Sequence, residues 1–163
     1  MAKELKTNAI RILEKNHIAF EMYTYECDEF VDGISAITKL GKPLERSFKT
    51  LVAQGRSKNY FVFVIPVAEE LDLKKAAAVV GEKFVELIPV KDITKVTGYV
   101  RGGCTPIGMK KEFQTVLHKS AFDFESIIIS GGRIGLQIEL NPHDLIRVIS
   151  GMTDDIIVHK ESI

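Results

Sequence analysis

The sequence predicts one α+β domain with a largely antiparallel sheet, and three observations lead to this class. Apolar patterns typical of strands and helices follow one another without the regular strand–helix–strand order of a parallel sheet. Neighbouring strand candidates are separated by short polar or glycine-containing connections, as in hairpins. The length of 163 residues suits one domain with a substantial core, and residues 1–163 contain no repeat or linker.

Capping residues and apolar periodicity place the helices. They are predicted over residues 7–16, 32–40, 72–81, 91–96 and 141–149. Four of them begin at residues whose side-chain oxygens can cap a first turn, namely Thr7 or Asn8, Asp32, Asp72 and Asn141. Glycines at positions 41, 81 and 151 end three of these helices.

Strand candidates occupy most of the remaining apolar sequence. They are predicted over residues 19–25, 48–54, 60–66, 84–88, 115–118, 126–130 and 134–140. The run 60–66 is apolar on both faces, so we expect this strand to be central and buried. Residues 55–59 and 131–133 are expected to be short connections, and residues 154–159 carry no clear pattern.

Composition restricts the class of protein. The chain has 22 basic and 22 acidic residues, which argues against a protein that coats DNA or other nucleic acid non-specifically. No apolar run reaches the ~20 residues that span a bilayer, and the first residues do not resemble a signal peptide. Two cysteines, Cys27 and Cys104, do not make a disulfide framework. We therefore expect a cytoplasmic protein with no membrane partner.

The stretch 98–109 is the most unusual part of the chain. It holds four glycines, a proline, an arginine and Cys104 between two patterned segments. Glycines let a second molecule approach the backbone closely, so this glycine loop is either a ligand-binding surface or a structural double turn.

Several familiar sites do not fit. The order Gly108-Met109-Lys110 differs from a phosphate loop, and the glycines after Ser130 lack the dinucleotide-binding spacing. The four histidines are scattered, so no metal site is expected. Cys104 has no histidine fixed nearby by the sequence, so a passive cysteine is favoured over a nucleophile.

Two other residues have unusual places. Lys49 enters an apolar strand, where alternation places it on the same face as Leu51 and opposite Phe48 and Thr50. Its ammonium must therefore either reach solvent or line a cavity. Ser130 ends a strongly apolar strand before two glycines, which suits a ligand-binding corner as well as an ordinary turn.

Taken in order, these segments resemble the YbaK/EbsC family of free-standing aminoacyl-tRNA deacylases, which is related to the editing insertion of bacterial prolyl-tRNA synthetase. The resemblance covers nearly the whole chain. It is carried by Ser47-Phe48-Lys49-Thr50-Leu51, Leu73-Lys74-Lys75-Ala76-Ala77, Thr97-Gly98-Tyr99, Gly102-Gly103-x-Thr105-Pro106-x-Gly108, Ser130-Gly131-Gly132-x-x-Gly135-Leu136, Glu139-Leu140 and Asp144-Leu145.

The resemblance implies one deacylase domain over residues 1–163, with a curved, barrel-like and mainly antiparallel sheet flanked by helices. It also implies a pocket with neither metal nor cofactor. The implied catalytic residues are Lys49, Gly102 and Ser130. The implied substrate-binding residues are Tyr25, Thr50, Gly103, Thr105 and Gln137. Four places depart from the family pattern. Thr105 replaces a common serine, Cys104 an apolar residue and Gln137 an aspartate of some members, and Asp32 or Val31 falls near an aromatic residue of some members.

The implied activity is the deacylation of Cys-tRNA(Pro), with Cys-tRNA(Cys) as a further candidate substrate and the substrate's own thiol assisting ester cleavage. Two alternatives stay open. One is a deacylase for another mischarged tRNA such as Ala-tRNA(Pro), and the other is a non-catalytic module that binds tRNA or a synthetase. The implied partners are tRNA(Pro) and prolyl-tRNA synthetase in a ternary complex. A basic rim from Arg46, Arg101, Lys110, Lys111 and Arg133 would suit a tRNA.

Overall fold

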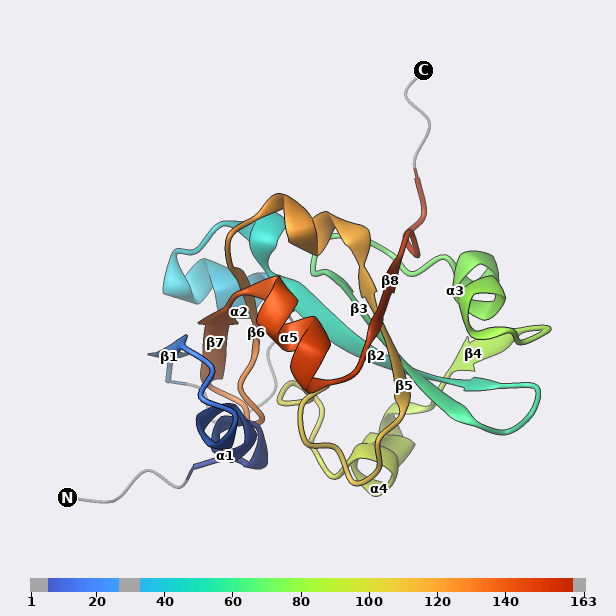
Figure 1. Ribbon diagram of the computed structural model, residues 1–163, viewed down its shortest axis with the longest axis horizontal. Helices are drawn as coiled ribbons and strands as arrows, with labels where there is room; N and C mark the ends of the chain where they lie inside the picture. Colours follow the sequence, from blue (N-terminus) through green and yellow to red (C-terminus); the bar gives the residue numbers. More distant parts are fainter. Residues whose placement is uncertain (1–5, 27–32, 160–163) are drawn as a thin grey trace.

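The computed structural model describes residues 6–26 and 33–159, whose strands form two sheets (Figure 1). The smaller sheet has the order β1 (Phe20–Thr24), β7 (Leu136–Leu140) and β6 (Ile127–Ser130), and both of its pairs are antiparallel. The larger sheet has the order β4 (Val85–Leu87), β2 (Phe48–Gly55), β3 (Tyr60–Pro66), β5 (Gln114–His118) and β8 (Met152–Asp154).

The predicted α+β class and the mainly antiparallel pairing are confirmed, with one refinement. The strands divide between two sheets that do not close, and one isolated parallel bridge, Ser47 to Ile128, links them. The pairs β3–β5 and β5–β8 are parallel, whereas the other four pairs are antiparallel. Parallel neighbours need long crossovers, and here residues 67–113 and 119–151 supply them.

The helices begin and end close to the residues at which the capping residues predicted their ends. They are α1 (Asn8–Lys15), α2 (Gly33–Leu40), α3 (Leu73–Val80), α4 (Ile93–Thr97) and α5 (Pro142–Val148), with 3-10 turns η1 (Leu44–Arg46), η2 (Val90–Asp92) and η3 (Lys119–Asp123). Thr7, Asp72 and Asn141 accept hydrogen bonds from the first turns of α1, α3 and α5. The predicted cap Asp32 lies outside the described residues. The short strand β8 was missed, because its three exposed residues show no alternation.

Two apolar clusters fill the spaces on either side of the larger sheet. Val62 and Val64 of β3 face the cluster that includes α1 and the smaller sheet, whereas Phe61, Phe63 and Ile65 face the cluster under α3. All five side chains are buried, which confirms the central strand predicted over residues 60–66.

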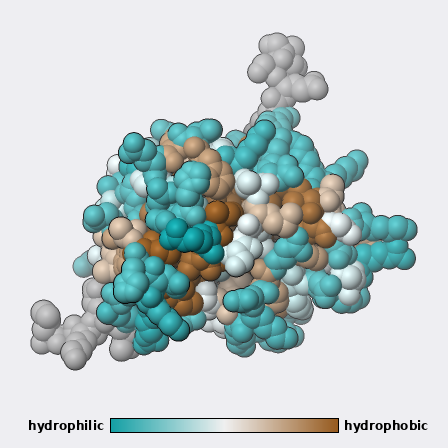
Figure 2. Space-filling model, viewed as in Figure 1, coloured by the Kyte–Doolittle hydropathy of each residue, from teal (hydrophilic) through white to brown (hydrophobic). Residues whose placement is uncertain are grey.

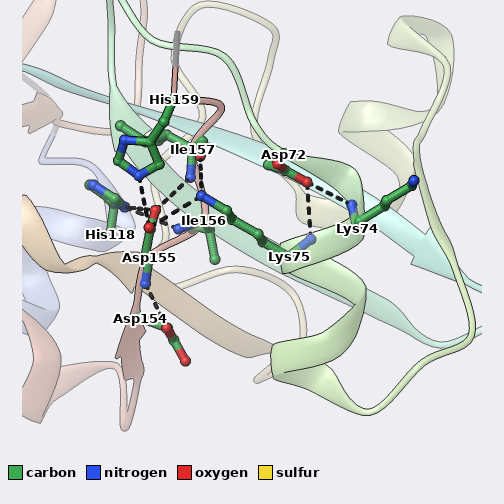
Figure 3. Close-up of polar contacts among 9 residues, drawn as sticks. All are labelled: Asp72, Lys74, Lys75, His118, Asp154, Asp155, Ile156, Ile157 and His159. Carbon is green, nitrogen blue, oxygen red and sulfur yellow. Dashed lines mark hydrogen bonds and ion pairs between the residues drawn. The ribbon is translucent and has the colours of Figure 1, made fainter. Parts of the chain in front are cut away.

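Hydrogen bonds and ion pairs around Asp155 hold the C-terminal segment, residues 155–159, against α3 and β5 (Figure 3). The Asp155 carboxylate lies 3.2 Å from the Lys75 ammonium and 2.7 Å from the His159 ring. Burial alone would raise the pKa of Asp155, but the hydrogen bonds from His159 and Lys75 outweigh it and lower the pKa to about 2. Beside it, the buried His118 ring accepts a hydrogen bond from the Ile156 amide at 3.2 Å.

Hydrophilic side chains cover most of the face shown in Figure 2, with apolar atoms exposed in patches between them. None of the helices in residues 6–26 and 33–159 has the length and apolar character that crossing a membrane requires.

Candidate functional site

A cavity of about 600 Å³ lies along the part of β2 that β4 does not reach. The pairing of β4 with β2 covers only Ala53 to Gly55, so the edge of the strand near Lys49 and Thr50 stays open. The walls of this pocket come from β2, α2, residues 87–93, the glycine loop and the neighbouring ends of β6 and β7. The pocket therefore lies where the two sheets meet.

Six of the eight site residues expected from the sequence line this one pocket. They are Tyr25, Lys49, Thr50, Gly102, Ser130 and Gln137. The structure thus brings together positions from four separate regions of the chain. The other two, Gly103 and Thr105, are buried behind the pocket lining and do not form part of it.

Lys49 is half-buried in the pocket wall. In the described part of the chain its ammonium has no hydrogen bond and no ion pair. Burial lowers the pKa of Lys49, and the charges of Glu70 and Glu69 partly offset that effect. A cation that is held at a cavity without a fixed partner is available to an anionic or partly negative group of a ligand.

The end of the smaller sheet presents polar side chains to the same cavity. Gln137 pairs with Ser130 on one side and with Tyr23 on the other. Residue Gln137 is only 8% exposed, and its amide has no hydrogen bond to any residue in 6–26 or 33–159. The Ser130 hydroxyl oxygen accepts a bond of 3.2 Å from the Gly132 amide, which leaves its own hydrogen to donate. Gln137 lines the pocket, so its free amide can donate and accept hydrogen bonds with a ligand held there.

The glycine loop owes its shape to two different glycines. Gly102 lines the pocket with φ +87°, a conformation that residues with side chains rarely adopt. Gly103 instead allows a close approach, because a Cβ there would lie 2.7 Å from the Cα of Arg133. Gly103 thus acts by packing the loop against the turn that follows Ser130. Thr105 is fully buried, and its hydroxyl has no hydrogen-bond partner among the described residues.

Cys104 lines the pocket, but its environment does not activate it. Burial raises the pKa of the thiol to about 11, although a hydrogen bond with Thr97 acts in the opposite direction. The thiol is therefore protonated at neutral pH, whereas the thiolate is the nucleophilic form. Of the described histidines, none lines the pocket, and His118 is engaged with the C-terminal segment. These features support a passive Cys104.

Sequence reasoning missed the apolar half of the pocket. Ile34, Leu87 and Val90 lie at the mouth and are 44%, 48% and 53% exposed. An exposed apolar residue in a short element gives no sequence signal, because only the tertiary fold shows which of them share an opening. Arg101 also lines the pocket, whereas Arg46 of the expected basic rim is bound to Glu139 and Ser126.

Comparison with known proteins identifies the family. Residues 31–148 match the model of the family described as the aminoacyl-tRNA editing domain. A relative from Enterococcus faecalis (strain ATCC 700802 / V583) is 42% identical over 152 residues, which cover 93% of each protein. The chain belongs to the aminoacyl-tRNA editing family. The resemblance to the YbaK/EbsC branch is confirmed, since that relative is EbsC, named as a candidate Cys-tRNA(Pro)/Cys-tRNA(Cys) deacylase.

Solved structures share the fold of this editing domain. A candidate trans-editing enzyme for prolyl-tRNA synthetase superposes with a TM-score of 0.80 at 20% identity and covers 96% of this chain and 100% of its own. The hypothetical protein APE2540 gives a TM-score of 0.83 at 18% identity and covers 93% of this chain and 99% of its own. At such identities the likeness concerns the fold alone.

Proposed function

We propose that this editing-family protein is an aminoacyl-tRNA deacylase whose substrate is Cys-tRNA(Pro), with Cys-tRNA(Cys) as a second substrate. One observation carries the proposal: the pocket at the junction of the sheets is lined by a cation, Lys49, and by the amide of Gln137, neither of which has a hydrogen-bond partner in the described part of the chain. The cavity of about 600 Å³ suits an aminoacyl group together with its terminal nucleoside. The name of EbsC supports the same substrate class.

The chemistry requires orientation more than a protein nucleophile. The cysteinyl thiol of the substrate attacks its own ester carbonyl, the carbon–oxygen bond to the ribose breaks, and the thiol proton ends on the leaving ribose oxygen. The product is a cyclic thiolactone, which water then opens. Gly102 would hold the reacting ester against the exposed backbone of the loop, and Lys49 would stabilise the negative charge that develops. A protonated Cys104 fits this scheme because no enzyme thiolate is needed.

The polar groups of the smaller sheet have roles in the same scheme. Ser130 and Thr50 offer hydroxyls near the ester, and Tyr25 and Gln137 would contact the amino acid or the ribose. Gly103 and Thr105 are assigned indirect roles, since both lie behind the lining and support the loop that carries Gly102. We infer that the protein works in the cytoplasm and that prolyl-tRNA synthetase can share the tRNA with it in a ternary complex.

The decisive experiment follows ester loss from charged tRNAs. We expect Cys-tRNA(Pro) to lose cysteine faster with the protein than in buffer, and Ala-tRNA(Pro) to be a poor substrate because it carries no thiol. Loss of Ala-tRNA(Pro) at an equal rate would remove the role of the substrate thiol. Stability of every charged tRNA at enzyme concentrations equal to the tRNA would overturn the deacylase assignment and favour a binding module.

A further inference from the structure

A polar cluster joins the two sheets beside the pocket. The Glu139 carboxylate of β7 accepts a 2.7 Å hydrogen bond from the Tyr23 hydroxyl of β1. Its other oxygen accepts hydrogen bonds from Arg46 of η1 and from Ser126, which precedes β6. Arg46 also donates to the Ser126 hydroxyl at 3.2 Å. One carboxylate therefore accepts hydrogen bonds from three segments, namely β1, η1 and the connection before β6, and of these only η1 leads into the larger sheet.

The cluster is largely withdrawn from solvent. The side chains of Arg46 and Glu139 are 27% and 13% exposed. Burial alone would raise the pKa of Glu139, but the hydrogen bonds from Ser126 and Tyr23 and the charge of Arg46 outweigh it, so the pKa is lowered. Glu139 is therefore ionised at neutral pH. Charge-assisted bonds of this kind fix geometry more firmly than neutral ones.

The cluster is joined to the pocket through strand register. Gln137 and Glu139 lie two residues apart on β7, so their side chains share one face of the smaller sheet. Arg46 ends η1, just before β2 of the larger sheet, and lies three residues before Lys49. The contact from Arg46 to Glu139 thus connects the strand that carries Lys49 with the strand that carries Gln137.

We propose that Arg46 and Glu139 are positioning residues that set the distance across the pocket between Lys49 and the pair formed by Ser130 and Gln137. The inference deepens the proposed function and rests on it. Alongside the Ser47–Ile128 bridge, this cluster is a polar connection between the sheets near the pocket. Neither residue lines the cavity, so each acts only through others.

The chain contains a matched pair for comparison. Lys75 and Asp155 also form an ion pair between separate elements, with side chains 35% and 26% exposed, but both are absent from the pocket lining (Figure 3). Removing either ion pair should lower the free energy of unfolding of the protein. Only the Arg46–Glu139 pair should alter the geometry around Lys49.

The test measures kcat and KM for Cys-tRNA(Pro) deacylation in Glu139→Gln, Arg46→Lys and Asp155→Asn, each corrected for its folded fraction. Because small displacements of reacting groups are costly, we expect kcat to fall about tenfold or more in Glu139→Gln with KM changed less than about threefold. The kcat of Arg46→Lys should fall less than that of Glu139→Gln. Asp155→Asn should keep the wild-type kcat. A wild-type kcat in Glu139→Gln, or an equal loss in Asp155→Asn, would overturn the proposal.

A second readout separates this proposal from the proposed function. Amide NMR shifts of Lys49 and Ser130 report the pocket geometry without turnover. We expect both to move in Glu139→Gln and to stay in place in Asp155→Asn. Unmoved shifts would overturn the positioning role even in an active protein. Moved shifts in a wild type that never deacylates tRNA would keep the positioning role and overturn only the proposed function.

Discussion

Gly103 and Arg133 approach each other so closely that position 103 has no room for a side chain. A Cβ there would lie 2.7 Å from the Arg133 Cα and 2.9 Å from its carbonyl carbon, which are backbone atoms that cannot rotate away. The glycine loop and the turn after Ser130 therefore keep their relative position only if residue 103 is glycine.

Gly103→Ala should consequently lower both stability and deacylation. Overpacking of this kind costs about 1–3 kcal/mol, which chemical denaturation can measure. Gly41→Ala is the control for lost stability alone, because the Gly41 φ of +67° is unsuited to alanine but nothing lies within 4 Å of the new Cβ. We expect Gly41→Ala to lose stability alone. Full activity in Gly103→Ala would mean that the two loops can separate without disturbing the pocket.

Lys49 and Cys104 should differ sharply on substitution. Lys49→Met removes the cation that opposes developing negative charge, a loss worth about a hundredfold or more in kcat. Cys104→Ala should keep wild-type deacylation, because the thiol is protonated at neutral pH. Both variants are assayed with Cys-tRNA(Pro) under single-turnover conditions. An inactive Cys104→Ala that folds normally would restore the enzyme thiol as a nucleophile.

The same lysine predicts an alkaline limit to activity. In the proposed mechanism the protonated ammonium is the active form, and burial holds its pKa below the ordinary value of 10.5. The catalysed rate, after subtraction of the uncatalysed ester loss, should therefore fall as pH rises toward 10.5. Lys49→Arg should move this fall to higher pH, since arginine stays charged throughout the range.

Acid should weaken the attachment of the C-terminal segment. The pKa of Asp155 is about 2 in the folded protein against an ordinary 3.8, so its contribution is complete above 3.8 and is lost as pH falls through about 2. Burial lowers the pKa of His118 below 6.5 in the folded protein, so the unfolded chain binds a proton at this residue more tightly. Proton binding therefore begins to favour unfolding as the pH falls below 6.5.

Thermal unfolding followed by circular dichroism from neutral to acid pH measures both effects. Tm should fall below pH 6.5 and fall further below 3.8. Asp155→Asn should lower Tm at neutral pH and flatten the lower part of the profile. Asp144→Asn breaks an exposed pair with Arg147 and should leave the profile unchanged. A flat wild-type profile down to pH 3.8 would contradict the role given to His118.

Cations beside the pocket should contribute to tRNA affinity. Residues 91–111 contain five basic residues and one acidic residue, whereas the whole chain is balanced. Lys95→Glu should weaken binding and reduce the slope of log Kd against log salt concentration by about one unit for each phosphate that Lys95 neutralises. Lys74→Glu on α3, away from the pocket lining, is the control and should bind normally. Equal weakening in both variants would indicate an effect of net charge alone.

Local chemistry predicted the elements well, and tertiary contacts explain what it missed. The caps Thr7, Asp72 and Asn141 act within one helical turn, so the residues alone are sufficient to place those helices. The connection between the two sheets depends on the bridge from Ser47 to Ile128, whose partners are far apart in the chain. No local pattern encodes such a pairing.

The site shows the same limit. Lys49 and Ser130 were conspicuous because a lysine stands at the entry of one apolar strand and a serine at the end of another. The engagement of Arg46 with Glu139 was not foreseen, because a surface arginine and one bound to a distant carboxylate look alike in a sequence. Whether the Gln137 amide finds a partner among the described residues likewise depends on neighbours that only the fold assembles.

The central place of β7 in the smaller sheet has a consequence for the newly made chain. Tyr25 follows a strand whose only sheet partner among the described strands, β7, spans Leu136–Leu140 near the other end of the chain. During synthesis β1 cannot pair with β7 until most of the protein has left the ribosome. Editing capacity therefore arises late and all at once, and a truncated chain ending before β7 would have no partial activity to misdirect against correctly charged tRNA.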